Sequence, residues 1–287
     1  MADVTLSRGY REPARVLPQG ILRAGRFSPR LAYSVWMREV MVYRHIWPST
    51  ILSNLFDPII YLLAMGFGLG AFLEGFTLQG VGEVTYLQYL APGIMASSIM
   101  MAAAFEMAWN TYIRIHQERL FEAMLATPAT TGDIVAGEMF WATTRSVIYS
   151  LVLLAVYGGF HLAGYRIFLG PPLLLLLVPL AAVLGGLLFS VVGMAYTAAV
   201  NNMEYLTFYF TLFLTPQFLF SGIFFPLPEW AEGIAWFIPL AHLVSLVRGL
   251  TLGGDLLSMA GHALWLVGAI LLLWSIPHYI VRRKPIH

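Results

Sequence analysis

The feature that most constrains this chain is a series of apolar runs, several of which reach the roughly 20 residues that a helix needs to cross a bilayer. Of the 287 residues, 59% are hydrophobic and only 11% are charged, and the mean hydropathy is +0.75. A soluble domain of this length does not need so much apolar surface. The sequence therefore predicts an all-α polytopic membrane protein.

Six apolar runs are predicted to cross the membrane as helices. Proline, glycine, asparagine or charged residues separate neighbouring runs, as expected where one helix ends and the chain turns. The runs make one membrane domain over residues 29–282, between tails at 1–28 and 283–287, with spans at about 49–72, 86–110, 136–160, 171–199, 205–224 and 258–281.

Residues 221–256 differ from the spans because three prolines interrupt the apolar run. Two tryptophans in this segment suit a membrane interface. We expect two short helices that enter the outer leaflet and return, with Arg248 able to pair with Glu229 or Glu232. The residues expected to form this outer cap are Phe225, Pro226, Trp230 and Arg248.

The segment before the first span is predicted to lie along the membrane surface. Ser28 followed by Pro29 is a typical helix start. Residues 30–46 then gather apolar side chains, among them Trp36, broadly on one side and arginines broadly on the other. Such a helix suits the interface between membrane and water. The alternative is the solvated face of an ordinary helix.

The distribution of arginine orients the chain. Eight arginines precede the first predicted span, and none lies in residues 73–85. Arg114 and Arg119 lie in the loop at 114–138, and a basic cluster ends the chain. The positive-inside rule therefore predicts that both termini and the 114–138 loop are cytoplasmic.

The 114–138 loop contains a short amphipathic helix, predicted over residues 118–126. Apolar residues fall on one side at helical spacing, and charged residues lie elsewhere. Thr127 before Pro128 ends the helix. Two interpretations stay open: a helix lying in the headgroup layer, or a helix that fills a groove on a soluble partner. The candidate residues are Glu118, Leu120, Phe121, Glu122, Met124 and Leu125.

Three polar residues stand out inside the predicted spans: Asn54, Asp57 and Glu106. A carboxylate within the bilayer costs several kcal/mol unless it is paired or wet. Asp57 is therefore expected to pair with a polar group or to face an interior cavity, pairing being favoured. An ion-coupled carrier or a channel, a competing function, would need charges lining the midplane. Asp57 and Glu106 are the candidates, but neither has an obvious cationic partner at that depth.

The chain has a single lysine, Lys284, and no cysteine. A phosphate-binding P-loop needs a lysine followed by serine or threonine, whereas Lys284 is followed by Pro285. The chain therefore cannot be a P-loop ATPase by itself. The absence of cysteine excludes disulfides and thiolate metal sites, and no metal or nucleic acid is expected.

An intramembrane serine hydrolase is a further alternative. Such an enzyme would need a Gly-x-Ser-Gly motif with a histidine on a nearby helix. Ser221-Gly222 follows Leu219-Phe220, so the first glycine is missing, and His262 is predicted to lie at a different depth. The sequence favours no catalytic residue.

In the order and spacing of its motifs, the chain resembles the membrane subunit of type-2 ABC exporters, and in particular their NodJ-like members. The similarity covers roughly residues 30–282. The motifs that carry it are Asn54 to Tyr61 with Gly66-Phe67-Gly68-Leu69-Gly70, then Glu122-Ala123-Met124-Leu125, then Gly132 to Met139, and finally Ser221 to Pro226 with Pro239-Leu240 and His242 to Arg248.

The resemblance implies a permease subunit in the bacterial inner membrane that acts as a homodimer. Two copies of an ATP-binding cassette subunit would bind ATP and magnesium and hydrolyse ATP beneath it. The helix at 118–126 would be the coupling helix, and the hairpin at 226–248 would cap the translocation path. The substrate would be amphipathic: a lipo-oligosaccharide, a polysaccharide, a lipid or a drug.

Overall fold

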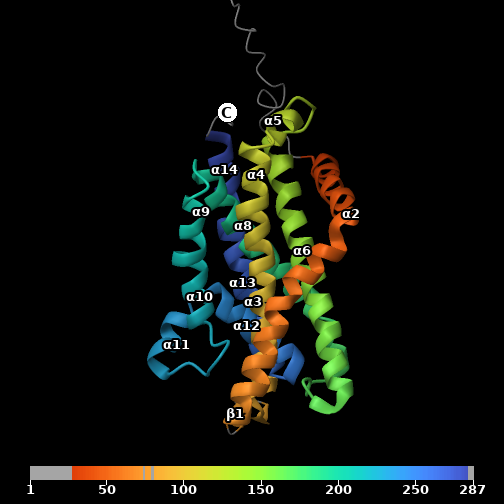
Figure 1. Ribbon diagram of the computed structural model, residues 1–287. Helices are drawn as coiled ribbons and strands as arrows, with labels where there is room; N and C mark the ends of the chain where they lie inside the picture. The colour runs from red at the N-terminus through yellow and green to blue at the C-terminus, as the bar shows by residue number, and fades with distance from the viewer. Residues whose placement is uncertain (1–27, 74, 79–80, 284–287) are drawn as a thin grey trace, which may run out of the picture.

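The computed structural model describes residues 28–73, 75–78 and 81–283 (Figure 1). The predicted tails at 1–28 and 283–287 fall almost wholly outside these ranges. The described chain is a bundle of helices, as expected, with very little sheet. Its helices are α2 (Pro29–Tyr61), α3 (Tyr86–Phe105), α4 (Thr111–His116), α5 (Leu120–Leu125), α6 (Thr131–Phe160), α7 (Pro172–Leu175), α8 (Val178–Ala199), α9 (Tyr205–Phe208), α10 (Thr215–Phe220), α11 (Glu229–Ala235), α12 (Pro239–Leu252), α13 (Leu256–Leu273) and α14 (Ser275–Arg283).

Tighter or wider helical turns join several of these helices. The π-helical segments are η1 (Leu62–Gly68), η3 (Glu106–Asn110), η4 (His161–Tyr165) and η5 (Tyr209–Leu214), and η2 (Leu69–Ala71) is a short 3-10 turn. Because these turns do not break the helical path, α3, η3 and α4 make one rod from Tyr86 to His116.

Five helices in the described ranges are long and apolar enough to cross a membrane. They confirm a polytopic membrane protein. The predicted fifth span, 205–224, corresponds to a shorter apolar helix at Tyr205–Phe220, and α12 is a second helix of this length class. The five long helices are Pro29–Ala71, Tyr86–His116, Thr131–Tyr165, Pro172–Ala199 and Leu256–Arg282.

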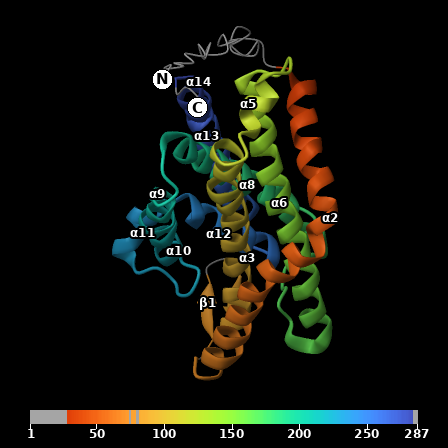
Figure 2. The same ribbon diagram turned by 45° about the horizontal axis from the view of Figure 1, so that its top comes forward.

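The predicted surface helix and the predicted first span form one continuous helix, α2. Pro48 and Pro58 lie inside it. Each proline removes one backbone hydrogen bond and favours a bend, and α2 changes direction partway along its length (Figure 1). The upper part runs beside α6, whereas the lower part crosses toward α3 (Figures 1 and 2).

Helix α3 forms the centre of the bundle. It packs against α6, α8 and α12 (Figure 2), and nearly all of its side chains are buried. A capping box starts it: the Thr85 hydroxyl accepts a hydrogen bond from the Gln88 amide, and the Gln88 side chain accepts one from the Thr85 amide.

Helices cross closely where one of them carries glycine. A Cβ added at Gly137 on α6 would lie 2.6 Å from the Cβ of Val35 on α2. A Cβ at Gly186 on α8 would lie 2.7 Å from that of Ser146 on α6. Gly66, which has Gly-x-x-x-Gly spacing with Gly70, approaches the side chain of Leu87 on α3, where an added Cβ would lie 2.6 Å from the Leu87 Cδ1. Close packing of this kind holds membrane helices together, because lipid tails are as apolar as the side chains and provide no hydrophobic driving force for helix association.

The connection between α2 and α3 contains a small hairpin that the sequence did not predict. Strand β1 (Phe76–Leu78) pairs antiparallel with β2 (Gly82–Val84). Gly82 has a φ of +99°, a conformation that favours glycine. The hairpin and α5 lie at opposite ends of the bundle (Figure 1).

Replacing Gly137 by alanine tests the crossing of α2 and α6. The added methyl group has no room, so we expect a loss of about 1–3 kcal/mol in unfolding free energy, as for other overpacked sites. Gly158→Ala, in the same helix, is the matched control because nothing lies within 4 Å of its added Cβ; alanine there should stabilise by up to about 1 kcal/mol. Unfolding in mixed micelles measures both, and equal effects would contradict this account of the crossing.

Candidate functional site

The predicted amphipathic helix at 118–126 is present as α5, at the end of the bundle that also holds α14 (Figure 1). It begins after Arg119, which has a left-handed backbone with φ 49°. This conformation costs free energy for a residue other than glycine, so the turn into α5 is tightly defined. Helix α5 thus projects from the end of the α3–η3–α4 rod.

The two faces of α5 differ in exposure. Phe121 and Leu125 are only 1% and 3% exposed and belong to a core cluster that includes Ile134 of α6. Ala123 and the preceding Glu118 are exposed, and Leu120, Glu122 and Met124 are half-buried. The apolar side chains of the predicted stripe therefore attach α5 to its own chain, at least in part. The surface offered outward centres on Ala123.

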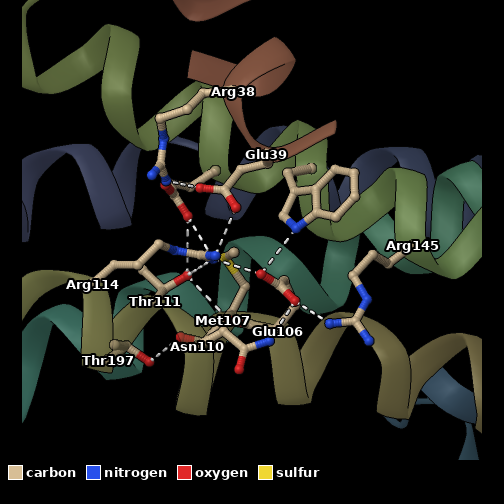
Figure 3. Close-up of polar contacts among 11 residues, drawn as sticks. Arg38, Glu39, Glu106, Met107, Asn110, Thr111, Arg114, Arg145 and Thr197 are labelled. Carbon is tan, nitrogen blue, oxygen red and sulfur yellow. Dashed lines mark hydrogen bonds and ion pairs between the residues drawn. The ribbon is translucent and has the colours of Figure 1, made fainter. Parts of the chain in front are cut away.

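Next to α5 lies a buried ionic cluster, formed by three arginines and three glutamates from α2, η3, α4 and α6 (Figure 3). The numbers of positive and negative groups match. Burying an unpaired ion costs several kcal/mol, so such a cluster is stable only when its charges balance and are hydrogen-bonded. Its members are Arg38, Glu39, Glu106, Arg114, Glu138 and Arg145.

Arg114 lies at the centre of this ionic cluster. Its guanidinium contacts Glu39 at 2.9 Å, Glu106 at 2.5 Å and Glu138 at 2.8 Å. These carboxylates come from α2, η3 and α6, and all three are at most 4% exposed. Thr111 adds a hydrogen bond from its hydroxyl to Glu138 at 3.3 Å. One side chain thereby links three segments of the chain.

Glu106 has four side-chain partners among the described residues. Besides Arg114, it pairs with Arg145, and it accepts hydrogen bonds from Trp141 at 3.0 Å and Asn110 at 2.7 Å. The expectation that Glu106 lacks a cationic partner is wrong. The π-helical turn η3, which contains Glu106, interrupts the regular backbone hydrogen bonding of the helix. One of its carbonyls, that of Met107, accepts a hydrogen bond from the Thr197 hydroxyl of α8 at 2.9 Å.

Glu138 and Arg145 are seven residues apart on α6 and so lie on one face of this helix. Both join the ionic cluster, but through different partners: Glu138 through Arg114, and Arg145 through Glu106. Glu39 was missed. Ala32, Val35 and Glu39 form a buried stripe on α2, at helical spacing that could have shown that this carboxylate faces the bundle.

A cavity of about 340 Å³ lies between α2, α3, α6 and the η5–α10 segment. Its wall is largely apolar and aromatic, including Phe105, Leu153 and Phe210. Asp57 lines it, is exposed, and forms no ion pair with any described residue. Of the two expectations for Asp57, the cavity is therefore correct and the pairing is wrong. The side chain of Asn54 lies outside the described ones.

The predicted outer cap contains two short helices, α11 and α12, which follow the loop at 221–228. Arg248 of α12 does not pair with Glu232; the Glu229 side chain is outside the described ones. Instead Arg248 donates hydrogen bonds to the carbonyls of Gly222 at 2.9 Å and Tyr89 at 3.3 Å, and its guanidinium lies 3.8 Å from the Tyr89 ring centroid. Arg248 thus ties this loop to α3, while Phe225, Pro226 and Trp230 are exposed.

His262, the proposed base of a serine hydrolase, is engaged elsewhere. Its Nδ1 lies 2.9 Å from Nδ1 of His242, whose Nε2 is 2.8 Å from the Trp236 carbonyl. The carbonyl requires a proton on Nε2 of His242, so neutral His262 donates from Nδ1. No hydrogen bond joins Ser221 to a partner in the described ranges. The two residues do not form a nucleophile–base pair.

The sequence profile of the ABC-2 type transporter family matches residues 30–252. Nodulation protein J of Rhizobium leguminosarum bv. viciae is 36% identical over 254 residues, which cover 88% of this chain and 93% of that protein. Nodulation protein J of Neorhizobium galegae is 32% identical over 273 residues, covering 94% and 95%. The inner membrane transport permease YadH of Escherichia coli (strain K12) is 23% identical over 221 residues, covering 75% and 80%.

Replacing Glu106 by glutamine tests the charge balance of the ionic cluster. Two buried guanidiniums lose a charged partner, so we expect a loss of about 3–5 kcal/mol in unfolding free energy. Adding Arg145→Met should recover part of it, because one unpaired cation is removed. Glu204→Gln, at an exposed carboxylate outside the cluster, should change little. A double variant less stable than Glu106→Gln alone would contradict this account.

Replacing Arg248 by methionine tests how the loop at 221–228 is attached to α3. A hydrogen bond from a charged group contributes about 1.5–3 kcal/mol, so the loop should open at least about tenfold more often. Ser221→Cys, introduced into this cysteine-free chain, reports the opening because Ser221 is only 3% exposed. Its reaction rate with a water-soluble maleimide should rise accordingly in Arg248→Met but not in Arg166→Met, an exposed arginine. Equal rates would contradict the assignment.

Proposed function

The chain belongs to the ABC-2 type transporter family, and from this premise we propose that it is the permease subunit of an ATP-driven exporter that moves an amphipathic substrate across the bacterial inner membrane. Membrane subunits of this family are permeases and are not catalytic themselves. In the proposed exporter both termini and α5 are cytoplasmic, in agreement with the positions of the arginines.

Energy would come from two copies of a separate ATP-binding cassette subunit. These copies would hold ATP and magnesium, which this chain has no P-loop to bind. The single lysine, Lys284, is followed by proline rather than serine or threonine, and the phosphates of ATP need a lysine in that motif.

The observation that carries the proposal is the construction of α5. This short helix is anchored from inside by Phe121 and Leu125, while Ala123 faces outward. A helix held rigidly on one side and exposed on the other suits docking into a groove of a soluble subunit. Ala123 and Glu118, rather than Phe121, are then the contacts with the ATPase.

The buried ionic cluster would carry movement of α5 into the bundle. Arg114 precedes α5 by six residues and holds α2 and α6 through Glu39 and Glu138. A push on α5 therefore acts directly on the segments that Arg114 joins. Rigid elements connected by a hydrogen-bonded network are the physical route by which such a displacement reaches a distant site.

The cavity would be part of the translocation path of a homodimer. The cavity is only partly enclosed by the described residues, and a second copy of the chain would close it. Its apolar and aromatic wall suits the hydrophobic part of an amphipathic substrate. Membrane lipid would cover the remaining apolar surface of the bundle. Because Glu106 is ion-paired, Asp57 is the remaining candidate carboxylate for the alternative function, an ion-coupled carrier.

Replacing the exposed Ala123 by arginine tests the proposed coupling surface. The full-length tagged protein is solubilised from its native membranes, purified, and analysed by mass spectrometry for a roughly stoichiometric P-loop ATPase. We expect Ala123→Arg to lower the amount of ATPase at least about tenfold, since a bulky charge would occupy the groove, and to leave the unfolding midpoint of the permease unchanged.

Ala163→Arg is the matched control, because Ala163 is exposed in η4 (His161–Tyr165) between α6 and α7. It should keep the ATPase. Phe121→Ala should lower the unfolding midpoint as well as the amount of ATPase, because Phe121 is buried. Recovery of the ATPase with Ala123→Arg at wild-type level would contradict the proposed role of α5, and a preparation of the wild-type protein without any ATPase would contradict the exporter.

A further inference from the structure

The cavity between α2, α3, α6 and the η5–α10 segment has a polar lining of an unusual kind. It includes the hydroxyls of Ser97, Ser98 and Thr215 and the carboxylate of Asp57. None of the described residues that line it is a lysine, an arginine or a histidine. The chemistry of these groups, and the direction of their hydrogen bonds, determine which head group the cavity can bind.

The three small hydroxyls already use their protons. Ser97 and Ser98 donate to the Ile94 carbonyl at 2.8 and 2.9 Å, and Thr215 donates to the Phe210 carbonyl at 3.0 Å. A hydroxyl that donates to its own helix retains only its acceptor lone pairs for a ligand. These residues therefore act as hydrogen-bond acceptors toward the cavity.

Asp57 adds a second acceptor of greater strength. An ionised carboxylate accepts hydrogen bonds and donates none, and its charge is not neutralised by any described arginine. Arg145 approaches the cavity only behind Tyr149: it donates to the Tyr149 hydroxyl at 2.8 Å and is paired with Glu106. Tyr149 itself lines the cavity, and its hydroxyl donates to the Thr50 carbonyl at 3.5 Å. Tyr61, whose hydroxyl can donate or accept, is the remaining polar side chain of the described lining.

The rest of the wall is apolar. Ile94, Met101, Phe105, Leu153 and Phe210 are among the side chains that line it. With about 340 Å³, the cavity lies at the lower end of the range for small-molecule sites. It therefore combines an apolar wall for a hydrocarbon chain with a polar region that supplies acceptors and one negative charge.

We propose that this cavity binds a single-chain amphiphile whose head group carries hydrogen-bond donors and no negative charge. The inference rests on the proposed exporter function and narrows its substrate class. Hydroxyl, amide and ammonium groups satisfy the lining, because each brings donors to Asp57 and the serine oxygens. A phosphate or sulfate head group is excluded, since it would place a second anion and further acceptors beside an unpaired carboxylate in a region of low dielectric.

Photo-crosslinking with three probes tests this proposal directly. The probes are dodecyl chains with a diazirine on the chain and an ammonium, a glucoside or a phosphate as the head group. The full-length permease is reconstituted in nanodiscs of neutral lipid, and cross-link yields are measured by peptide mass spectrometry. Yield at the α3 segment containing Met101 and Phe105 reports the cavity, and yield at the exposed Leu271 and Leu272 of α13 reports probe dissolved in the bilayer.

The cross-link yield of each probe at the cavity is divided by its yield at the bilayer-facing residues. The resulting ratio should be at least about tenfold higher for the ammonium and glucoside probes than for the phosphate probe, which corresponds to about 1.4 kcal/mol. Asp57→Asn should lower the ammonium signal about tenfold and the glucoside signal much less, because an amide still accepts a hydrogen bond but carries no charge. Asp57→Glu should keep the wild-type order. Ala102→Trp, which fills the cavity, should abolish the signal of all three probes.

Equal labelling of the cavity by all three probes would overturn the proposed head-group selectivity. So would an Asp57→Asn variant in which the ammonium probe still labels the cavity as strongly as it does in the wild-type protein. Labelling of the cavity at or below the bilayer signal by every probe would overturn the cavity as a site for amphiphiles. Neither result depends on the ATPase, so each is separable from a failure of the exporter function, which the capture of the P-loop ATPase tests independently.

Discussion

Three carboxylates converge on one guanidinium, and the end of the bundle that holds α5 depends on this arrangement. Arg114 bonds to Glu39, Glu106 and Glu138, which belong to α2, η3 and α6. None of these ions would be stable alone at this depth. Arg38 and Arg145 complete the charge balance. Because one guanidinium binds carboxylates from three segments at once, it fixes these segments relative to one another. This end of the bundle, beside α5, therefore has a defined geometry.

Elsewhere the bundle is held differently. Around α3, glycine at the crossings lets backbones approach, as between Gly186 and Ser146. At the other end, no described carboxylate pairs with Arg248, which is held by two carbonyls and the face of Tyr89. Charge balance, close packing and carbonyl hydrogen bonds therefore all contribute to holding the bundle together.

Much of this organisation was accessible from the sequence, because long apolar runs, helix caps and prolines are local signals. The helix α5, the two short helices α11 and α12, and the polytopic class follow from them. The partners of buried charges do not. Glu106 and Arg114 are eight residues apart, yet Arg145 and Glu39 reach them from other helices, and spacing within one helix says nothing about which neighbouring face lies opposite.

The same limit applies to Phe121 and Asp57. Spacing places Phe121 on an apolar stripe, but whether the stripe faces the chain itself or a partner depends on α6. Asp57 was expected to pair because an unpaired carboxylate is costly; the cavity beside it supplies the alternative that only the assembled bundle shows. Sequence patterns thus identify the important residues more readily than the surfaces they face.

The continuity of α2 has a consequence for how such chains can change in length. Glu39 of the ionic cluster and Asp57 of the cavity are 18 residues apart on one continuous helix, which is about five full turns. Counted along the helix, the two side chains therefore fall on the same face. Inserting or deleting one residue between them would rotate one site by about 100° relative to the other. A change of a single residue in the length of this stretch would therefore separate the two sites.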